Sequence, residues 1–77
     1  MRDELVGRLV VAVVTRIEAY GLYLEYSGKP LLVLIPDVSY ESTPDLHVKY
    51  RVGDEVAVRV LDYIEEHRMF KGTIKDA

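Results

Sequence analysis

The stretch IEAYGLYLEY, residues 17–26, places three tyrosines at intervals of three around a single glycine. Neither regular period explains this spacing. A strand would turn Tyr20 and Tyr23 to opposite faces, and a glycine followed by a Leu-Tyr-Leu alternation is poor helix material. A bulge or a positive φ at Gly21 would shift the alternation by one residue. We therefore predict a turn leading into a strand over residues 22–26, with Tyr20 and Tyr23 on one face.

The same shift predicts which side chains of this strand are buried. Leu22 and Leu24 would point into the core on the side of Tyr26, while Glu25 would lie on the side of Tyr23. Two exposed tyrosines on one face of a sheet form a platform on which nucleic-acid bases can stack. The spacing alone leaves a structural role equally open, in which the tyrosines cap the end of the core with only their hydroxyls in water.

The rest of the chain is dominated by β signals separated by turns. Residues 5–17 form a valine-rich run that is apolar at both parities, so we expect both of its faces to be covered for part of its length. Glycine- or charge-rich segments at residues 27–30, 52–54 and 65–67 are typical of turns. Five strands are predicted in all, over residues 5–17, 22–26, 31–35, 55–63 and 68–75.

A polar segment over residues 36–53 separates the third and fourth predicted strands. Thr43 as N-cap and Pro44 at the first helical position would start a short helix there, and Leu46 and Tyr50 would pack it onto the sheet. Five strands with a short helix between the third and fourth favour an OB-fold, a Greek-key β-barrel, over an SH3-like barrel. We predict a single all-β domain over residues 1–77.

Composition narrows the classes of function. The chain has no cysteine and only two histidines, His47 and His67, so a zinc site is not expected. It also lacks a glycine-rich phosphate loop and any arrangement typical of an activated nucleophile, so we predict no enzyme activity and no cofactor. The charged N-terminus and short apolar runs predict neither a signal peptide nor a membrane span, which favours a cytoplasmic location.

Several short motifs along the chain resemble the S1 RNA-binding domain family. They occur in the family's order and spacing, and the resemblance covers residues 6–75. The motifs are Val-Gly at 6–7, Val-Thr-Arg-Ile at 14–17, Tyr-Gly-Leu-Tyr-Leu at 20–24, Leu-Leu-Val-Leu-Ile-Pro at 31–36, Val-Gly-Asp-Glu-Val at 52–56 and Gly-Thr-Ile-Lys at 72–75. The resemblance implies an OB-fold that binds single-stranded RNA in translation or in RNA turnover.

The family's binding face uses two aromatic residues, a histidine on the third strand, an aspartate ending the fourth and an arginine on the fifth. By resemblance, Tyr20 and Tyr23 take the aromatic positions and would stack bases. Leu34 stands where the histidine would be, and Arg68 takes the position of the arginine.

Two further positions of this face have alternatives in the chain. Ile64 occupies the aspartate position, although Asp62 lies two residues earlier at the same parity. One extra residue near the last hairpin would put Met69 where the family has its arginine. The fold resemblance is therefore good, whereas the binding face is only partly retained.

Basic residues beside the tyrosines would contact phosphates. The candidates are Arg68 and Lys71, helped by Arg16 or Arg59. The alternative for each of them is that it only lies on a solvent-exposed outer face. The net charge of −3 argues against binding by bulk electrostatics.

We predict a non-catalytic module that binds single-stranded RNA weakly and with low sequence specificity, with a protein of the translation or RNA-decay machinery as a second candidate partner. The alternative is a protein-interaction module that has lost most RNA affinity, favoured by Leu34. An acidic mimic of a nucleic acid is a third reading, supported by charge alone.

Overall fold

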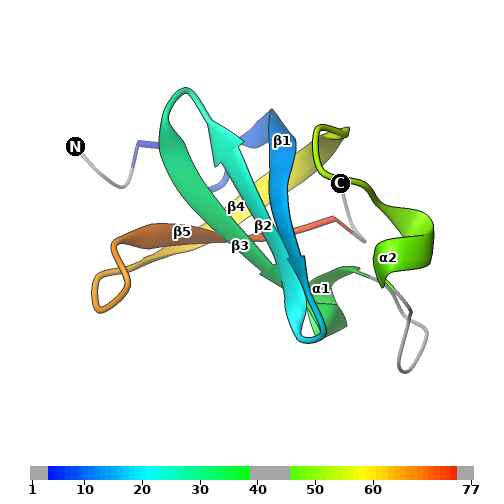
Figure 1. Cartoon of the computed structure of the whole chain (residues 1–77). Helices are drawn as coiled ribbons and strands as arrows, with labels where there is room; N and C mark the ends of the chain where they lie inside the picture. The colour runs from blue at the N-terminus through cyan, green and yellow to red at the C-terminus, as the bar shows by residue number, and fades with distance from the viewer. Residues whose placement is uncertain (1–3, 39–45, 75–77) are drawn as a thin grey trace.

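The computed structural model describes residues 4–38 and 46–74. Five strands and two short helices follow one another along this part of the chain (Figure 1). The strands are β1 (Leu9–Glu18), β2 (Gly21–Tyr26), β3 (Lys29–Leu34), β4 (Glu55–Ile64) and β5 (Met69–Thr73). The helices α1 (Ile35–Val38) and α2 (Leu46–Lys49) both lie between β3 and β4.

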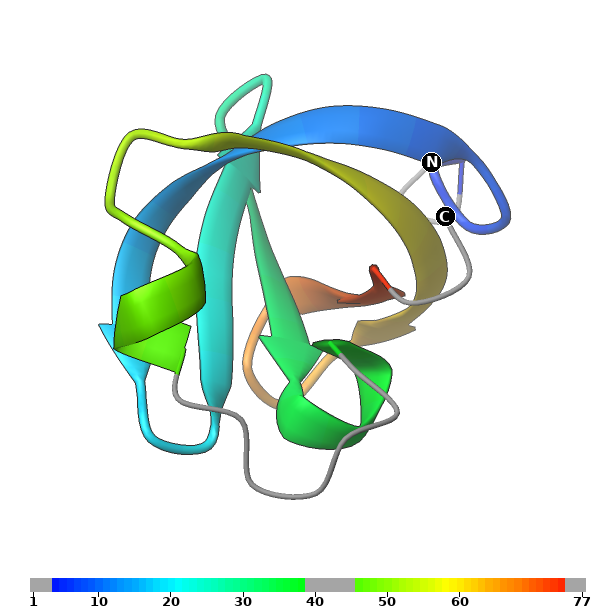
Figure 2. The same ribbon diagram turned by 90° about the vertical axis from the view of Figure 1, so that its right-hand side faces the viewer.

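The strands close into a barrel in the order β1-β2-β3-β5-β4. The pairing of β3 with β5 is parallel and the other pairings are antiparallel. Figure 2 shows the long β1 and β4 curving together over the barrel, with α1 at its opposite end. Closure leaves every strand paired on both sides, so the barrel has no free edge. The predicted five-stranded barrel with helical structure between the third and fourth strands is confirmed.

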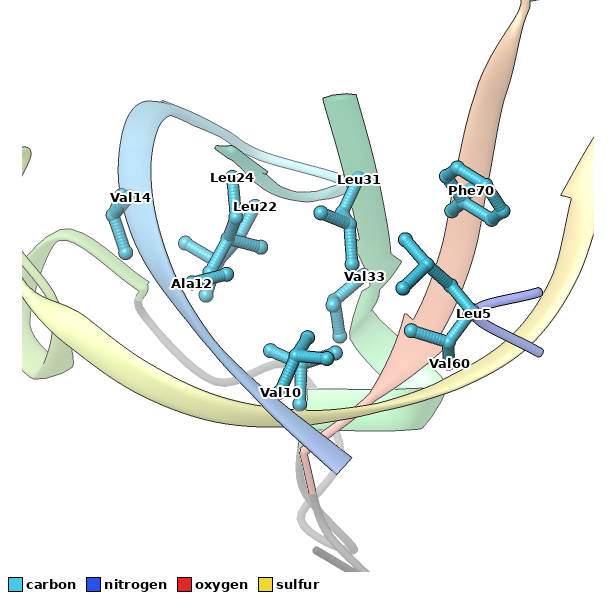
Figure 3. Packing of buried hydrophobic residues seen from close by; sticks show 11 residues of the cluster. Leu5, Val10, Ala12, Val14, Leu22, Leu24, Leu31, Val33, Val60 and Phe70 are labelled. Atoms are coloured by element: carbon cyan, nitrogen blue, oxygen red, sulfur yellow. The ribbon is translucent and has the colours of Figure 1, made fainter. Parts of the chain in front are cut away.

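Alternation along the strands places one apolar face of each inside the barrel. Leu22 and Leu24 are almost fully buried and Tyr26 packs against the same core, whereas Glu25 is exposed, as predicted. Figure 3 shows the buried side chains pointing into the barrel. The core consists of Leu5, Val10, Ala12, Val14, Leu22, Leu24, Leu31, Val33, Val58, Val60 and Phe70.

The expectation that both faces of the first strand are covered is wrong. Burial alternates strictly from Leu9 to Val14, and Val11 remains 58% exposed. The strand also begins at Leu9 rather than at residue 5, because residues 4–7 form a turn from which Leu5 inserts its side chain into the core. A run of valines is therefore compatible with a strand that has one solvent-exposed face, since β-branched residues favour strands whether or not they are buried.

Other boundaries differ because of turn and helix chemistry. The β2–β3 hairpin turns on only two residues, Ser27 and Gly28, with φ values of 50° and 77°. Positive φ at both central residues suits the twist of a tight hairpin. Residues 35–38 form α1, where the sequence predicts the end of a strand at residue 35 and a polar segment from residue 36. The predicted cap at Thr43 and Pro44 lies outside the described residues.

Candidate nucleic-acid interface

The turn between β1 and β2 brings Tyr20 and Tyr23 together. Tyr20 lies in this turn rather than in a strand, and Tyr23 is the third residue of β2. Gly21 is not among the residues with positive φ, so the predicted reset at this glycine is wrong. The irregularity lies in β1 instead, where the pairing with β2 shifts between Val14 and Arg16. Such a bulge re-aims side chains at the end of a strand pair.

Gly21 has a different function, which is to allow two backbones to approach closely. A Cβ atom at this position would lie 2.4 Å from the carbonyl oxygen of Val33. The backbone N–H of Ile35, the first residue of α1, donates a hydrogen bond of 3.0 Å to the carbonyl oxygen of Tyr20. The turn that carries Tyr20 is therefore held against the end of β3, next to α1 (Figure 1).

The two tyrosines contact each other directly. Their hydroxyl oxygens are 2.7 Å apart, and their rings meet edge to face with centroids separated by 6.0 Å. Tyr20 is 47% exposed and Tyr23 is half-buried. The hydrogen bond with Tyr23 raises the pKa of the Tyr20 hydroxyl above its ordinary value. A tyrosine hydroxyl is neutral at physiological pH even without this shift, so it does not repel a phosphate.

Arg16 contacts the ring of Tyr23. Its guanidinium carbon is 5.3 Å from the centroid of the Tyr23 ring, which is within the range of a cation–π contact. The Nε–H of Arg16 donates to the carboxylate of Glu18, and this interaction raises the pKa of the Arg16 side chain. Arg16 is thus held between a carboxylate and an aromatic ring, with much of its side chain in water.

Strand register extends this arrangement into a row across the barrel. Arg16 pairs with Tyr23, Tyr23 with Leu32, Leu32 with Lys71, and Lys71 with Asp62. The row crosses β1, β2, β3, β5 and β4, and Leu32 at its centre is only 8% exposed. Asp62, rather than Ile64, is the residue that faces Lys71, because the register of β4 shifts between Val60 and Asp62. We call these five residues the tyrosine row.

The remaining predicted contacts fall outside the tyrosine row. Leu34 pairs with Gly21 and is partly buried beside the turn that carries Tyr20. Arg59 pairs with Leu9 and Thr73, and its Nη1 donates a hydrogen bond of 3.0 Å to the carbonyl oxygen of Gly7. Arg68 lies in the β4–β5 turn with a φ of 52°.

Sequence reasoning missed Glu18 and Leu32 as neighbours of the site. Leu32 carries no chemical signal of its own, since its importance comes from the register that places it between Tyr23 and Lys71. The sequence signal for Glu18 was its spacing of two from Arg16, which puts both side chains on one face of a strand.

The described residues hold neither a metal centre nor a membrane-spanning helix. No three of their histidine, aspartate and glutamate side chains gather closely enough to hold a metal ion. His47 and His67 are both exposed, and they lie in different segments of the chain. Neither α1 nor α2 has the length or apolar character needed to cross a bilayer.

Comparison with known proteins agrees with this geometry. Residues 5–75 match the family described as the S1 RNA binding domain. The chain is 31% identical over 70 residues to polyribonucleotide nucleotidyltransferase of Bacillus cytotoxicus, covering 90% of this chain and 10% of that protein. It is 32% identical over 66 residues to small ribosomal subunit protein bS1 of Helicobacter pylori, covering 86% of this chain and 12% of that protein. The chain thus spans about a tenth of these curated relatives.

A solved structure gives the same result for the fold. One protein chain of the a/eIF2alpha–aDim2p–rRNA complex from Pyrococcus horikoshii OT3 superposes with a TM-score of 0.80 at 26% identity. The match covers 92% of this chain and 44% of that chain. Since the family match extends over nearly the whole sequence and the barrel has the expected topology, the chain belongs to the S1 RNA-binding domain family.

Proposed function

We propose that this chain is a non-catalytic module that binds single-stranded RNA weakly and with little sequence preference. The observation that carries the proposal is the pair of exposed Tyr20 and half-buried Tyr23, which lies beside Arg16 and in register with Lys71 through Leu32. Aromatic rings stack on any base, and nearby cations meet the phosphates that join the bases. Tyr20 and Tyr23 would therefore stack bases, while Arg16 and Lys71 would contact the backbone.

The length of the tyrosine row sets the size of the binding site. Neighbouring strands lie about 4.8 Å apart, so the four steps from β1 to β4 follow roughly 19 Å of the curved surface of the closed barrel. This length suits a short segment, near the lower end of the roughly 4–16 nucleotides that one OB-fold covers. Arg59 and Arg68 lie outside the row and would contact only a longer strand.

Weak binding follows from the charges along the row. Arg16 is paired with the carboxylate of Glu18, and Lys71 lies opposite Asp62 in the register of β4 and β5. A cation that is already neutralised releases fewer counterions when it meets a phosphate. The electrostatic contribution to affinity is therefore small, in keeping with the net charge of −3.

Low specificity follows from the apolar character of Leu34, which neither donates nor accepts a hydrogen bond through its side chain. It stands beside the tyrosine turn, where a polar side chain could read the edge of a base. Stacking on tyrosine does not distinguish strongly between bases. The site would therefore hold RNA through stacking on the tyrosine rings and through contacts with the RNA backbone.

The relatives suggest the cellular setting. Their names belong to a polyribonucleotide nucleotidyltransferase and to a ribosomal subunit protein, which act on or assemble with RNA. We place this module in the cytoplasm, in translation or RNA turnover, where a protein of that machinery would be its further partner.

The test is a titration with fluorescently labelled oligouridines of about 4, 8 and 16 nucleotides. It should be run at about 50 mM and at about 200 mM salt, because phosphate contacts weaken as salt rises. We expect measurable binding at low salt that weakens at the higher concentration and changes little from 8 to 16 nucleotides. If no oligomer binds at low salt and high protein concentration, RNA binding is not the function of this barrel.

Neutralising Glu18 is expected to strengthen RNA binding. Glu18→Gln releases Arg16 from its ion pair, so the guanidinium can meet a phosphate with its full charge. The slope of log affinity against log salt should steepen by about 0.7, the value for one additional phosphate contact on a single strand. Both changes are measured in the same titrations.

Glu66→Gln is the matched control for this variant, because it makes the same change in net charge at an exposed position in the β4–β5 turn. It should improve affinity less than Glu18→Gln and leave the slope almost unchanged. Equal effects of the two variants would mean that only net charge matters. A weaker Glu18→Gln complex would instead show that Glu18 orients Arg16 for binding.

A further inference from the structure

An exposed apolar stripe runs along the outer face of β1 and β4. Leu9, Val11 and Val13 are 50%, 58% and 39% exposed, and all three point away from the core. Ala57 pairs with Val11 across the strands and is exposed too. We call these four residues the valine stripe. Figure 2 shows that β1 and β4 lie together along one side of the barrel, at the opposite end from α1.

The two ends of the valine stripe carry opposite charges. At one end Arg59 pairs with Leu9, and at the other end Glu55 pairs with Val13. Glu25 of β2 pairs with Val13 from the other side, which adds to the acidic end. Val11 and Ala57 lie midway between these ends. The surface is therefore apolar in the middle, basic at one end and acidic at the other.

A surface with this pattern is complementary to itself. If a second copy is turned by a twofold axis that crosses the strands at Val11 and Ala57, β1 faces β1 and β4 faces β4 in opposite directions. Val11 then meets Val11 of the second copy, and Arg59 of each copy faces Glu55 of the other. The small side chain of Ala57 allows the two sheets to approach closely. A contact of this kind is isologous and closes as a dimer.

We propose that the valine stripe is a self-association surface that joins two copies of this chain face to face. Strand addition is not available to it, because β1 and β4 are each paired on both sides. Three half-exposed apolar side chains and a charged rim form a smaller patch than the roughly 800 Å² per partner of a standard interface. The dimer is therefore weak and forms at high concentration.

The dimer is independent of the proposed RNA site. The stripe occupies Leu9 to Val13 of β1, whereas Tyr23 pairs with Arg16 further along that strand and Tyr20 lies in the turn that follows it. Each dimer would carry two tyrosine rows, and linked sites raise the apparent affinity for a strand long enough to reach both. Because self-association is measured without RNA, the failure of either proposal can be told from the failure of the other.

Analytical ultracentrifugation over a range from micromolar to millimolar protein tests the dimer. The apparent mass of the wild type should rise from 8.8 kDa towards twice that value. Val11→Glu places a carboxylate on the twofold axis and should raise the dimer dissociation constant at least about tenfold. Val48→Glu is the matched control, since Val48 is 80% exposed but lies in α2, and it should associate like the wild type.

Charge reversal tests the orientation of the two copies. Glu55→Arg alone and Arg59→Glu alone each place like charges opposite one another and should weaken the dimer. The double variant exchanges the charges and should restore it. A wild type that stays monomeric at all concentrations would overturn the proposal, leaving the stripe to another partner or to solvent. Equal effects of Val11→Glu and Val48→Glu, or single reversals that the double variant does not rescue, would overturn it as well.

Discussion

Replacing Tyr20 and Tyr23 together by alanine is expected to weaken RNA binding at least about thirtyfold. A base stacked on an aromatic side chain contributes about 1–3 kcal/mol, so the loss of two stacks removes at least about 2 kcal/mol. The rings touch each other, and the single variants are not expected to add up to the double one. Fluorescence anisotropy with a labelled oligouridine at low salt measures all three variants.

Phenylalanine at the same two positions provides the control for this result. Tyr20→Phe with Tyr23→Phe keeps both rings and removes only the hydroxyls that lie 2.7 Å apart. Affinity should then stay within a few-fold of the wild type, because stacking uses the ring faces. If the phenylalanine pair loses as much as the alanine pair, the hydroxyls and not the rings hold the RNA. If neither pair changes binding, the RNA site lies elsewhere on the barrel.

Strand positions were predictable wherever a single residue pattern decides them. β2 and β4 alternate between apolar and polar residues, and both were found within one residue of their expected ends. The outer valines of β1 were wrongly expected to be buried. A valine favours a strand whether its side chain is buried or exposed, so the sequence does not separate the two cases.

α1 was missed because Ile35 reads as the end of an apolar strand and Pro36 as the start of a polar segment. Its position depends on contacts with distant residues. The Thr73 hydroxyl and the Ile74 N–H both donate hydrogen bonds to the carbonyl oxygen of Asp37. No local sequence pattern around residue 37 indicates hydrogen-bond partners that lie so far along the chain.

The residue types at the candidate site were predictable from the sequence, but their placement in one row across the strands was not. Arg16 contacts the Tyr23 ring and the two tyrosines contact each other, whereas Lys71 is reached only through its register with Leu32. That these residues bind RNA stays a prediction. Their common row depends on register shifts in β1 and in β4, and packing across the barrel decides such shifts. For the same reason, Leu32 could not be recognised in advance as the residue between Tyr23 and Lys71.

The largest expected effect on stability is that of Gly21→Ala. Its Cβ atom would lie 2.4 Å from the carbonyl oxygen of Val33 and 3.0 Å from the Cα atom of Leu34. Both atoms belong to the backbone of β3, which cannot move aside without breaking its pairing with β2. We expect a loss of about 3 kcal/mol or more in the free energy of unfolding, measured by urea denaturation followed by circular dichroism. A total stability of roughly 5–15 kcal/mol leaves little after such a loss.

Two other glycines separate steric contact from backbone strain. Gly28 has a φ of +77°, and the Cβ atom added by Gly28→Ala would have no atom within 4 Å. Backbone strain alone should therefore lower the free energy of unfolding by about 1–2 kcal/mol. Gly72→Ala would meet Val58 Cγ1 at 2.4 Å and the carbonyl oxygen of Arg59 at 3.1 Å, so its closest contact is a side chain and its backbone contact is longer than that of Gly21→Ala. The expected order of destabilisation is therefore Gly21, then Gly72, then Gly28. A Gly21→Ala protein as stable as Gly28→Ala would mean that β3 yields, and then Tyr20, held by the N–H of Ile35, would shift with it.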